Sequence, residues 1–138
     1  VLRELLHSFP NLAMTTDLSN STALHTAATQ GHIDVVNLLL ESDSNLAKIA
    51  RNNGKTVLHS AARMGHLEVV KALLNKDPST GFRTDKKGQT ALHMAVKLKG
   101  QNEEILLELV KPEPAVLSLE DNKGNTALHI ATKKGRTQ

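Results

Sequence analysis

Apolar residues recur at helical spacing in three segments of the chain that resemble one another. These segments are "IDVVNLLL" from Ile33, "LEVVKALL" from Leu67 and "EEILLELV" from Glu103. In each, apolar side chains stand at i, i+3 and i+4, which places them on one face of a helix and predicts that this face is buried. Shorter runs rich in small residues, "ALHTAA" and "VLHSAA", precede the first two segments. The pattern therefore predicts pairs of helices, in which the small side chains of the short first helix let neighbouring helices approach closely.

Polar residues and glycines mark the expected ends of these helices. A threonine stands directly before each short run, where it favours the start of a helix; these are Thr22, Thr56, Thr90 and Thr126. Gly31 and Gly65 follow the first helices and are expected to end them. Asn53-Gly54, Lys87-Gly88 and Lys123-Gly124 predict tight turns between successive helix pairs.

The helix pair is an internal repeat. The first histidine of each copy stands at position 25, 59, 93 or 129, so the steps are 34, 34 and 36 residues. One unit cannot bury its apolar face alone, whereas stacked units form a continuous core. The chain is therefore predicted to be a single all-α solenoid over residues 1–138. Residues 1–19 would form the second half of a repeat, residues 20–53, 54–87 and 88–123 three complete repeats, and residues 124–138 the first part of another.

Four motifs carry a resemblance to a known family. They are Thr-Ala-Leu-His, Ala-Ala-x-x-Gly-His, a Val-Val-x-x-Leu-Leu helix and an Asp/Asn-x-x-Gly turn, and over essentially the whole chain they resemble ankyrin repeats. The generic ankyrin signature is Thr-Pro-Leu-His. This chain has Ala or Val instead of Pro, which is tolerable because Pro is favoured but not required in the first turn of a helix. Tetratricopeptide repeats share the period, but their Trp, Gly and Tyr pattern is absent.

The resemblance implies an ankyrin-repeat solenoid of helix–turn–helix units joined by hairpin-like loops. It also implies that the histidine of each Thr-x-Leu-His motif forms hydrogen bonds within its repeat and to the next one. The residues of this structural motif are Thr22, His25, Thr56, His59, Thr90, His93, Thr126 and His129.

A narrower resemblance rests on "FPNLAMTTD", "NNGKTVLHSAARMGH", "GFRTDKKGQTALHMAVK" and "DNKGNTALHIATKKGR". These stretches resemble the plant ankyrin-repeat membrane proteins, in which cytosolic repeats precede a transmembrane region called the PGG domain. The resemblance implies a role in stress or defence signalling. Two extra residues, effectively Leu98-Lys99, depart from that pattern and account for the 36-residue step. They are expected to extend the first helix of their repeat or its turn.

Composition narrows the possible settings and partners. No apolar run approaches the ~18 residues that a membrane span needs, so this segment is expected to be soluble and to make no direct membrane contact. Without an initiator Met or a signal-peptide pattern, the chain reads as part of a longer protein. With no Cys, a cytoplasmic setting fits, and the parent protein is expected at the cytosolic face of a membrane. Two aromatic residues and charge blocks of alternating sign disfavour nucleic-acid binding.

Some stretches look like phosphate-binding or metal-binding motifs, but the spacing of their residues does not fit. Gly54-Lys55-Thr56 resembles the end of a phosphate-binding loop, but Ile49 stands where that loop needs its first Gly. The pairs His25/His32 and His59/His66 are each interrupted by a glycine turn, which breaks a common metal-binding face. Glu103, Glu104 and Glu108 are expected to form a solvated helix face. We therefore predict no catalytic set, no metal site and no cofactor.

What remains is the surface, where positions that differ between repeats are the best candidates for recognition. The resemblance places two such sets, the turn tips and the ends of the first helices, along the concave groove in which ankyrin proteins commonly bind partners. Arg63 and Met64 are the preferred pair, because Arg and Met are enriched at interface cores. The full set is Leu18, Ser19, Ser21, Thr29, Gln30, Asn52, Asn53, Lys55, Arg63, Met64, Lys86, Lys87, Gln89, Lys97, Leu98, Lys99, Asn122, Lys123, Asn125, Lys133 and Lys134.

The sequence therefore predicts a non-enzymatic module that binds another protein, of unknown identity and with an acidic patch. Two alternatives stay open: a structural spacer whose groove is empty, and a regulatory domain that docks on the rest of its own parent chain. End-to-end self-association through exposed apolar ends is also expected, since solenoids need polar capping repeats for solubility.

Overall fold

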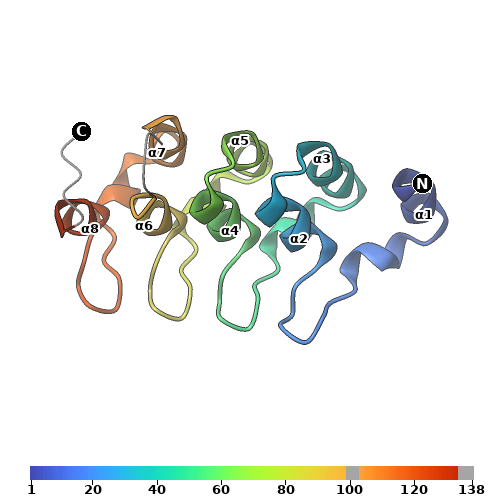
Figure 1. Cartoon of the computed structure of the whole chain (residues 1–138), viewed down its shortest axis with the longest axis horizontal. Helices are drawn as coiled ribbons and strands as arrows, with labels where there is room; N and C mark the ends of the chain where they lie inside the picture. The colour runs from blue at the N-terminus through green and yellow to red at the C-terminus, as the bar shows by residue number, and fades with distance from the viewer. Residues whose placement is uncertain (99–102, 134–138) are drawn as a thin grey trace.

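The computed structural model describes residues 1–98 and 103–133 as a row of stacked helix pairs (Figure 1). Within those ranges the chain is helical and contains no strand. The α-helices are α1 (Leu2–Ser8), α2 (Ala23–Gln30), α3 (Ile33–Ser42), α4 (Val57–Met64), α5 (Leu67–Lys76), α6 (Ala91–Ala95), α7 (Glu103–Val110) and α8 (Ala127–Lys133). The predicted all-α solenoid is confirmed.

The helices form two layers. Helices α2, α4, α6 and α8 make one row, the inner layer, and α1, α3, α5 and α7 make a second, the outer layer (Figure 1). Long loops project from the inner layer on the side away from the outer layer, and each loop carries the turn between two repeats. Among the described helices, none is long and apolar enough to cross a membrane.

The inner helices begin at the predicted threonines through reciprocal hydrogen bonds. In α4, the Oγ1 of Thr56 accepts the His59 N–H at 3.4 Å, while the Nδ1 of His59 accepts the Thr56 N–H at 3.1 Å. Such a capping box satisfies backbone donors at the helix start, and a side-chain cap typically stabilises by about 1 kcal/mol. The same arrangement is present at Thr22 and Thr90.

Gly31 and Gly65 end α2 and α4 in the left-handed conformation, as predicted. Gly31 has a second reason to be glycine, because a Cβ there would lie 2.6 Å from Nδ1 of His66 in the next repeat. The His66 ring is held by donation from its Nε2 to the carbonyl of Thr29, at 2.9 Å. The turn at Gly31 therefore also packs against the His66 ring of the next repeat.

The core lies between the layers and runs the length of the array. Leu24, Leu58 and Leu92 occupy the same position in successive inner helices and are 0–2% exposed. Alanines of the inner helices, such as Ala28 and Ala62, are fully buried beside them. Small side chains here allow α2, α4 and α6 to pack directly against one another, as the sequence pattern predicted.

Four short 3₁₀ helices were not anticipated from the sequence. They are η1 (Pro10–Met14), η2 (Ser44–Lys48), η3 (Pro78–Phe82) and η4 (Pro114–Ser118). An acidic residue caps three of them, as in η3, where Asp77 accepts the Ser79 N–H at 3.1 Å. A hydrogen bond from the Ser79 hydroxyl is the main cause that lowers the pKa of Asp77. These turns bring the chain from the outer layer back to the hairpin loops.

The third repeat departs from the expectation for its two extra residues. Helix α6 has 5 residues, whereas α2 and α4 have 8, so the first alternative, a longer helix, is not what the structure shows. The second alternative, a longer turn, stays a prediction because part of the turn lies outside the described residues. Helix α6 is capped at its end by Val96 in the right-handed conformation, whereas α2 and α4 are capped by left-handed glycines. Leu98 lies within the described chain, but Lys99 lies outside the described residues.

Candidate functional site

The loop tips are hairpins joined to one another by backbone hydrogen bonds. The Asn52 N–H donates to the Ser19 carbonyl at 2.9 Å, Lys86 to Asn53 at 3.1 Å, and Asn122 to Lys87 at 2.9 Å. Two side-chain amides add to this row: Asn52 Nδ2 donates to the Leu18 carbonyl at 3.0 Å, and Asn122 Nδ2 to that of Lys86 at 2.9 Å. The predicted recognition residues Asn52 and Asn122 therefore hold the hairpins together.

An aspartate organises the hairpin in three of the four tips. Asp17, Asp85 and Asp121 stand at the same position of their repeats, and each accepts two backbone N–H groups of its own turn. These hydrogen bonds lower the pKa values of Asp17 and Asp121. Burial favours a raised pKa for Asp85, but hydrogen bonds from Gln89 and Lys55 outweigh it, and the pKa is lowered.

The second tip carries Arg51 where the others carry aspartate. Its backbone hydrogen bonds are those of the other tips, but the side-chain acceptor for the Lys55 N–H is the Oδ1 of Asn53, at 3.0 Å. The Nε of Arg51 is buried and has no hydrogen-bond partner within the described chain. Sequence reasoning missed this residue, although aligning the tips in register as Asp17, Arg51, Asp85 and Asp121 would have shown the exception.

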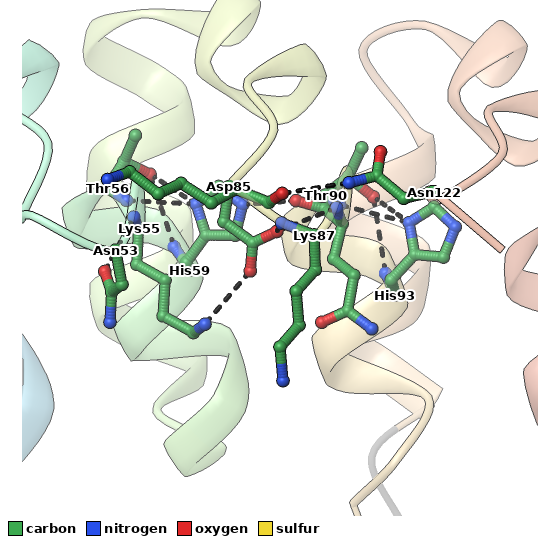
Figure 2. Close-up of polar contacts among 11 residues, drawn as sticks. Asn53, Lys55, Thr56, His59, Asp85, Lys87, Thr90, His93 and Asn122 are labelled. Atoms are coloured by element: carbon green, nitrogen blue, oxygen red, sulfur yellow. Dashed lines mark hydrogen bonds and ion pairs between the residues drawn. The ribbon is translucent and has the colours of Figure 1, made fainter.

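Lys55 and Asp85 form an ion pair between successive hairpins. The Nζ of Lys55 lies 3.0 Å from Oδ2 of Asp85, and their side chains are 19% and 1% exposed. Figure 2 shows Lys55 bent toward Asp85, while the Lys87 side chain extends from the neighbouring hairpin in a similar direction. The predicted recognition residue Lys55 thus has an internal partner, whereas Lys87 forms no ion pair in the part of the chain that the structure describes.

The histidines of the repeat motif divide into two groups. His59 and His93 accept a hydrogen bond within their own repeat and donate from Nε2 to the next hairpin, at 2.8 Å to Gln89 and 2.9 Å to Asn125. This confirms the role that the resemblance implied for them. Burial is the main influence on the pKa of His59 and lowers it, against the raising effect of the Gln89 carbonyl.

His25 accepts the Thr22 N–H at 3.1 Å but lacks the second contact. Its Nε2 is buried without a hydrogen bond of normal geometry among the described residues. Burial lowers its pKa most, while the Ile49 carbonyl lies close enough to raise it partly. His129, at the other end of the array, makes the internal contact to Thr126 at 3.1 Å.

Three hollows follow the inner layer where it meets the hairpins; we call them together the hairpin groove. Their volumes are about 240, 530 and 380 Å³. The first two share Arg51, and the last two share Lys87, Gln89 and Lys97, so each hollow adjoins the next. Among the described residues, seven Lys and Arg side chains but only two carboxylates line the groove.

Comparison with known proteins is decisive for the family. A family model described as ankyrin repeats in three copies matches residues 1–82, which is more than half of the chain. A second, described as ankyrin repeats in many copies, matches residues 58–110. The chain belongs to the ankyrin-repeat family. Ankyrin repeats are modules of protein–protein interaction, and their domains are typically non-catalytic. No match is found among curated proteins.

The ankyrin array brings most of the predicted recognition residues into the hairpin groove. Those that line it are Ser21, Thr29, Gln30, Asn53, Lys55, Arg63, Lys86, Lys87, Gln89, Lys97, Leu98, Asn122, Lys123 and Asn125. Leu18, Ser19, Asn52, Met64 and Lys133 are not among its lining residues. Lys99 and Lys134 lie outside the described residues.

The preferred pair is separated by the ankyrin fold. Arg63 lines the groove, whereas Met64, which is 48% exposed, does not. Consecutive residues on a helix point about 100° apart, so both cannot face the same hollow. Met94 of α6 lines the groove instead, and it was not predicted because its position in the repeat reads as core.

The outer layer of the ankyrin array has hollows of a different kind. One of about 620 Å³ is lined by Glu68, Lys71, Glu108 and Lys111, among others, and a second of about 390 Å³ by Arg3 and Glu41. These charges pair internally: Lys71 with Glu68 at 3.7 Å, Lys111 with Glu108 at 3.1 Å, and Arg3 with Glu41 at 4.0 Å. Across the described parts of the array, no group of three or more His, Asp or Glu residues could hold a metal ion.

Proposed function

We propose that this chain is a non-enzymatic protein-interaction module that binds another protein through the hairpin groove. The observation that carries the proposal is the contrast within each repeat. Positions of the core keep their residue type, as with Leu24, Leu58 and Leu92. Positions that face the groove vary, as with Thr29, Arg63 and Lys97 at equivalent positions of successive repeats. Stacking requires the first set alone, so the second is available for recognition.

The groove also offers the physical means of binding. Hollows of about 240–530 Å³ allow side chains of a partner to enter. Polar backbone groups at the tips are already satisfied by the hairpin row, so a partner does not have to compete for them. Side chains therefore carry the specificity, which differs from one repeat to the next.

A quantitative affinity capture from plant cytosol and membrane extract tests this proposal. The chain would be compared with a variant that carries Arg63→Glu, a substitution at a residue that lines the groove, and with an outer-layer control, Lys71→Glu. Circular dichroism would verify that each variant is folded. Proteins lost with the first variant and kept with the second support the groove. Identical captures with all three proteins would contradict it.

Two other outcomes have their own signatures. Binding of the separately made remainder of the parent chain, abolished by Arg63→Glu, would replace an external partner with intramolecular regulation. No groove-dependent association in any assay would leave a structural spacer. A thermal-shift screen with zinc and nucleotides addresses enzymatic alternatives, since a ligand at 100 times its Kd adds about 2.7 kcal/mol of stability.

The wider setting is part of the same proposal. The stretches "FPNLAMTTD" and "DNKGNTALHIATKKGR" support assignment to the cytosolic part of a plant membrane protein with a PGG region, active in stress or defence signalling. Fractionation of plant tissue, with an antibody raised against this chain, tests that assignment. The antigen should be found in the membrane pellet, and a purely soluble antigen would contradict it.

A further inference from the structure

We infer that the hairpin groove binds an extended acidic segment of its partner, with carboxylates at about every third residue. This inference rests on the proposed function and specifies the chemistry of the partner. It follows from the sign, the pairing and the spacing of the charges that line the groove.

The lining of the groove has more cations than carboxylates. Seven basic side chains line it, one of which, Lys55, pairs with Asp85 from outside the lining, against the carboxylates of Asp17 and Asp121. Those two carboxylates each accept two backbone N–H groups of their own turn. They are therefore already committed to holding the hairpins in shape, and they offer the groove cations little compensation.

Five of the cations are available to a partner. Within the described chain, Arg63, Lys86, Lys87 and Lys123 are exposed and form no ion pair. Arg51 is half-buried and forms no ion pair there either, and its Nε has no hydrogen-bond partner. Arg51 lines two of the three hollows, so a carboxylate of the partner can approach its guanidinium from the groove.

Outer-layer charges show that this is a property of the groove rather than of the whole surface. There, Lys71, Lys111 and Arg3 each have an acidic partner within 4.0 Å. The unpaired cations that line the groove therefore contrast with the paired cations that line the outer-layer hollows, and they can attract an acidic partner from a distance.

The repeat sets the spacing of the cations. Lys87 and Lys123 occupy equivalent positions of successive hairpins, and Arg63 and Lys97 occupy equivalent positions of successive repeats. Packed helices lie about 8–10 Å apart, and a peptide in the extended polyproline II conformation rises about 3.1 Å per residue with about three residues per turn. Three residues of such a peptide span about 9 Å and return to the same face, so a carboxylate at every third position meets one repeat after another.

A pair of synthetic peptides of about 12 residues, labelled at one end, tests both charge and spacing. In the first, Glu stands at every third position; in the second, the same residues are rearranged so that the Glu residues are consecutive. Fluorescence anisotropy at low salt should show the spaced peptide binding at least ~10-fold more tightly. Equal affinity of the two peptides would overturn the spacing, and no binding of either at millimolar concentration would overturn the inference.

Matched variants locate the site. Arg63→Gln with Lys87→Gln should weaken binding of the spaced peptide ~10-fold or more, whereas Lys71→Gln with Lys111→Gln, an equal loss of charge on the outer layer, should leave it unchanged. Equal weakening by both would indicate non-specific attraction and overturn the inference. All four residues are exposed in the structure, and circular dichroism checks the fold of each variant.

Binding of other acidic ligands distinguishes an acidic protein segment from a nucleic acid or a membrane. Tighter binding of a single-stranded oligonucleotide or of phosphatidylserine vesicles than of the spaced peptide would overturn the assignment to an acidic protein segment. If the peptide fails but capture of partner proteins still depends on Arg63, the proposed function stands and the acidic specificity falls. If both fail, the groove is not a binding site.

Discussion

The hairpin groove and the outer helix layer are built from the same repeats, yet they treat charge in opposite ways. On the outer layer, Glu68 and Glu108 each stand one helical turn from the lysine with which they pair. In the groove, the aspartates turn inward to the backbone and the lysines and arginines remain. Surface pairs of the first kind typically contribute less than 1 kcal/mol. The difference shows that the outer layer is locally neutral, while the groove holds an unbalanced charge that a partner can use.

Asp85 offers the largest test of this contrast. Asp85→Ala removes the partner of Lys55 and the acceptor of two backbone N–H groups, so it should lower the free energy of unfolding by about 2–3 kcal/mol. The matched outer-layer change, Glu68→Ala, should lower it by less than about 0.5 kcal/mol. Urea unfolding of both variants measures the two values, and equal losses would remove the distinction.

The pH dependence of stability sharpens the comparison next. Burial lowers the pKa values of His25 and His59, both in the inner layer. The unfolded chain therefore binds protons that the folded chain does not, so stability should fall as pH drops below about 6.5. The slope is at most about 1.4 kcal/mol per pH unit for each such histidine. Urea unfolding at pH 7 and pH 5.5 measures it, and His59→Gln should reduce the slope. A flat profile would contradict the prediction.

A second loss is expected in stronger acid. Asp85 has a lowered pKa, so its contribution is complete above the unfolded value of about 3.9 and is lost as pH falls through the folded one. Asp85→Asn should flatten the stability profile below pH ~4, as measured by urea unfolding.

Arg51→Asp tests whether the positive charge of Arg51 in the groove lowers the free energy of unfolding of the chain. The substitution restores the aspartate of the other hairpins and adds an acceptor for backbone N–H groups, so the free energy of unfolding should rise by about 0.5–1 kcal/mol. Affinity for the spaced acidic peptide should fall at the same time. Arg51→Gln is the control, which removes the charge without adding the acceptor. A destabilised Arg51→Asp variant would show that Arg51 stabilises its hairpin.

The smallest effect concerns the end of the array, which belongs to neither face. Leu128 is 73% exposed, whereas the equivalent Leu24, Leu58 and Leu92 are 0–2% exposed. An exposed apolar side chain of this kind favours weak association at high concentration. Light scattering should show a mass that rises with concentration, and Leu128→Lys should reduce the rise. A mass that stays monomeric at every concentration of the unsubstituted chain would contradict this prediction.

Much of the fold was predictable because the repeat makes each local signal recur. Thr56, His59 and Gly65 each have counterparts one period away, so the start and end of a helix could be confirmed against its neighbours. The 3₁₀ helices escaped prediction because five residues are too short to show a periodicity. Their acidic caps, such as Asp77, were visible but had no helical pattern beside them.

The site was predictable in its location but not in its detail. Comparison of the repeats predicted that Arg63 and Lys87 lie at the surface, and both line the hairpin groove, because residues that stacking does not need are free to face solvent. Their role in recognition stays a prediction. Lys55 and Asp85, by contrast, are 30 residues apart, and only the stacked structure brings them to 3.0 Å. Arg51 was not predicted because it stands three residues before Gly54, outside the residues that flank the glycine of the turn. Only an alignment of the four tips shows that it replaces an aspartate.

The row of hydrogen bonds between hairpins also has a mechanical consequence. Backbone bonds at 2.9–3.1 Å join Ser19 to Asn52, Asn53 to Lys86, and Lys87 to Asn122, whereas the outer helices meet through side chains. These hydrogen bonds hold the spacing between successive hairpins. We therefore expect that bending of the array changes the spacing of the outer helices more than the spacing of the hairpins, so that the groove keeps a constant distance between its repeats.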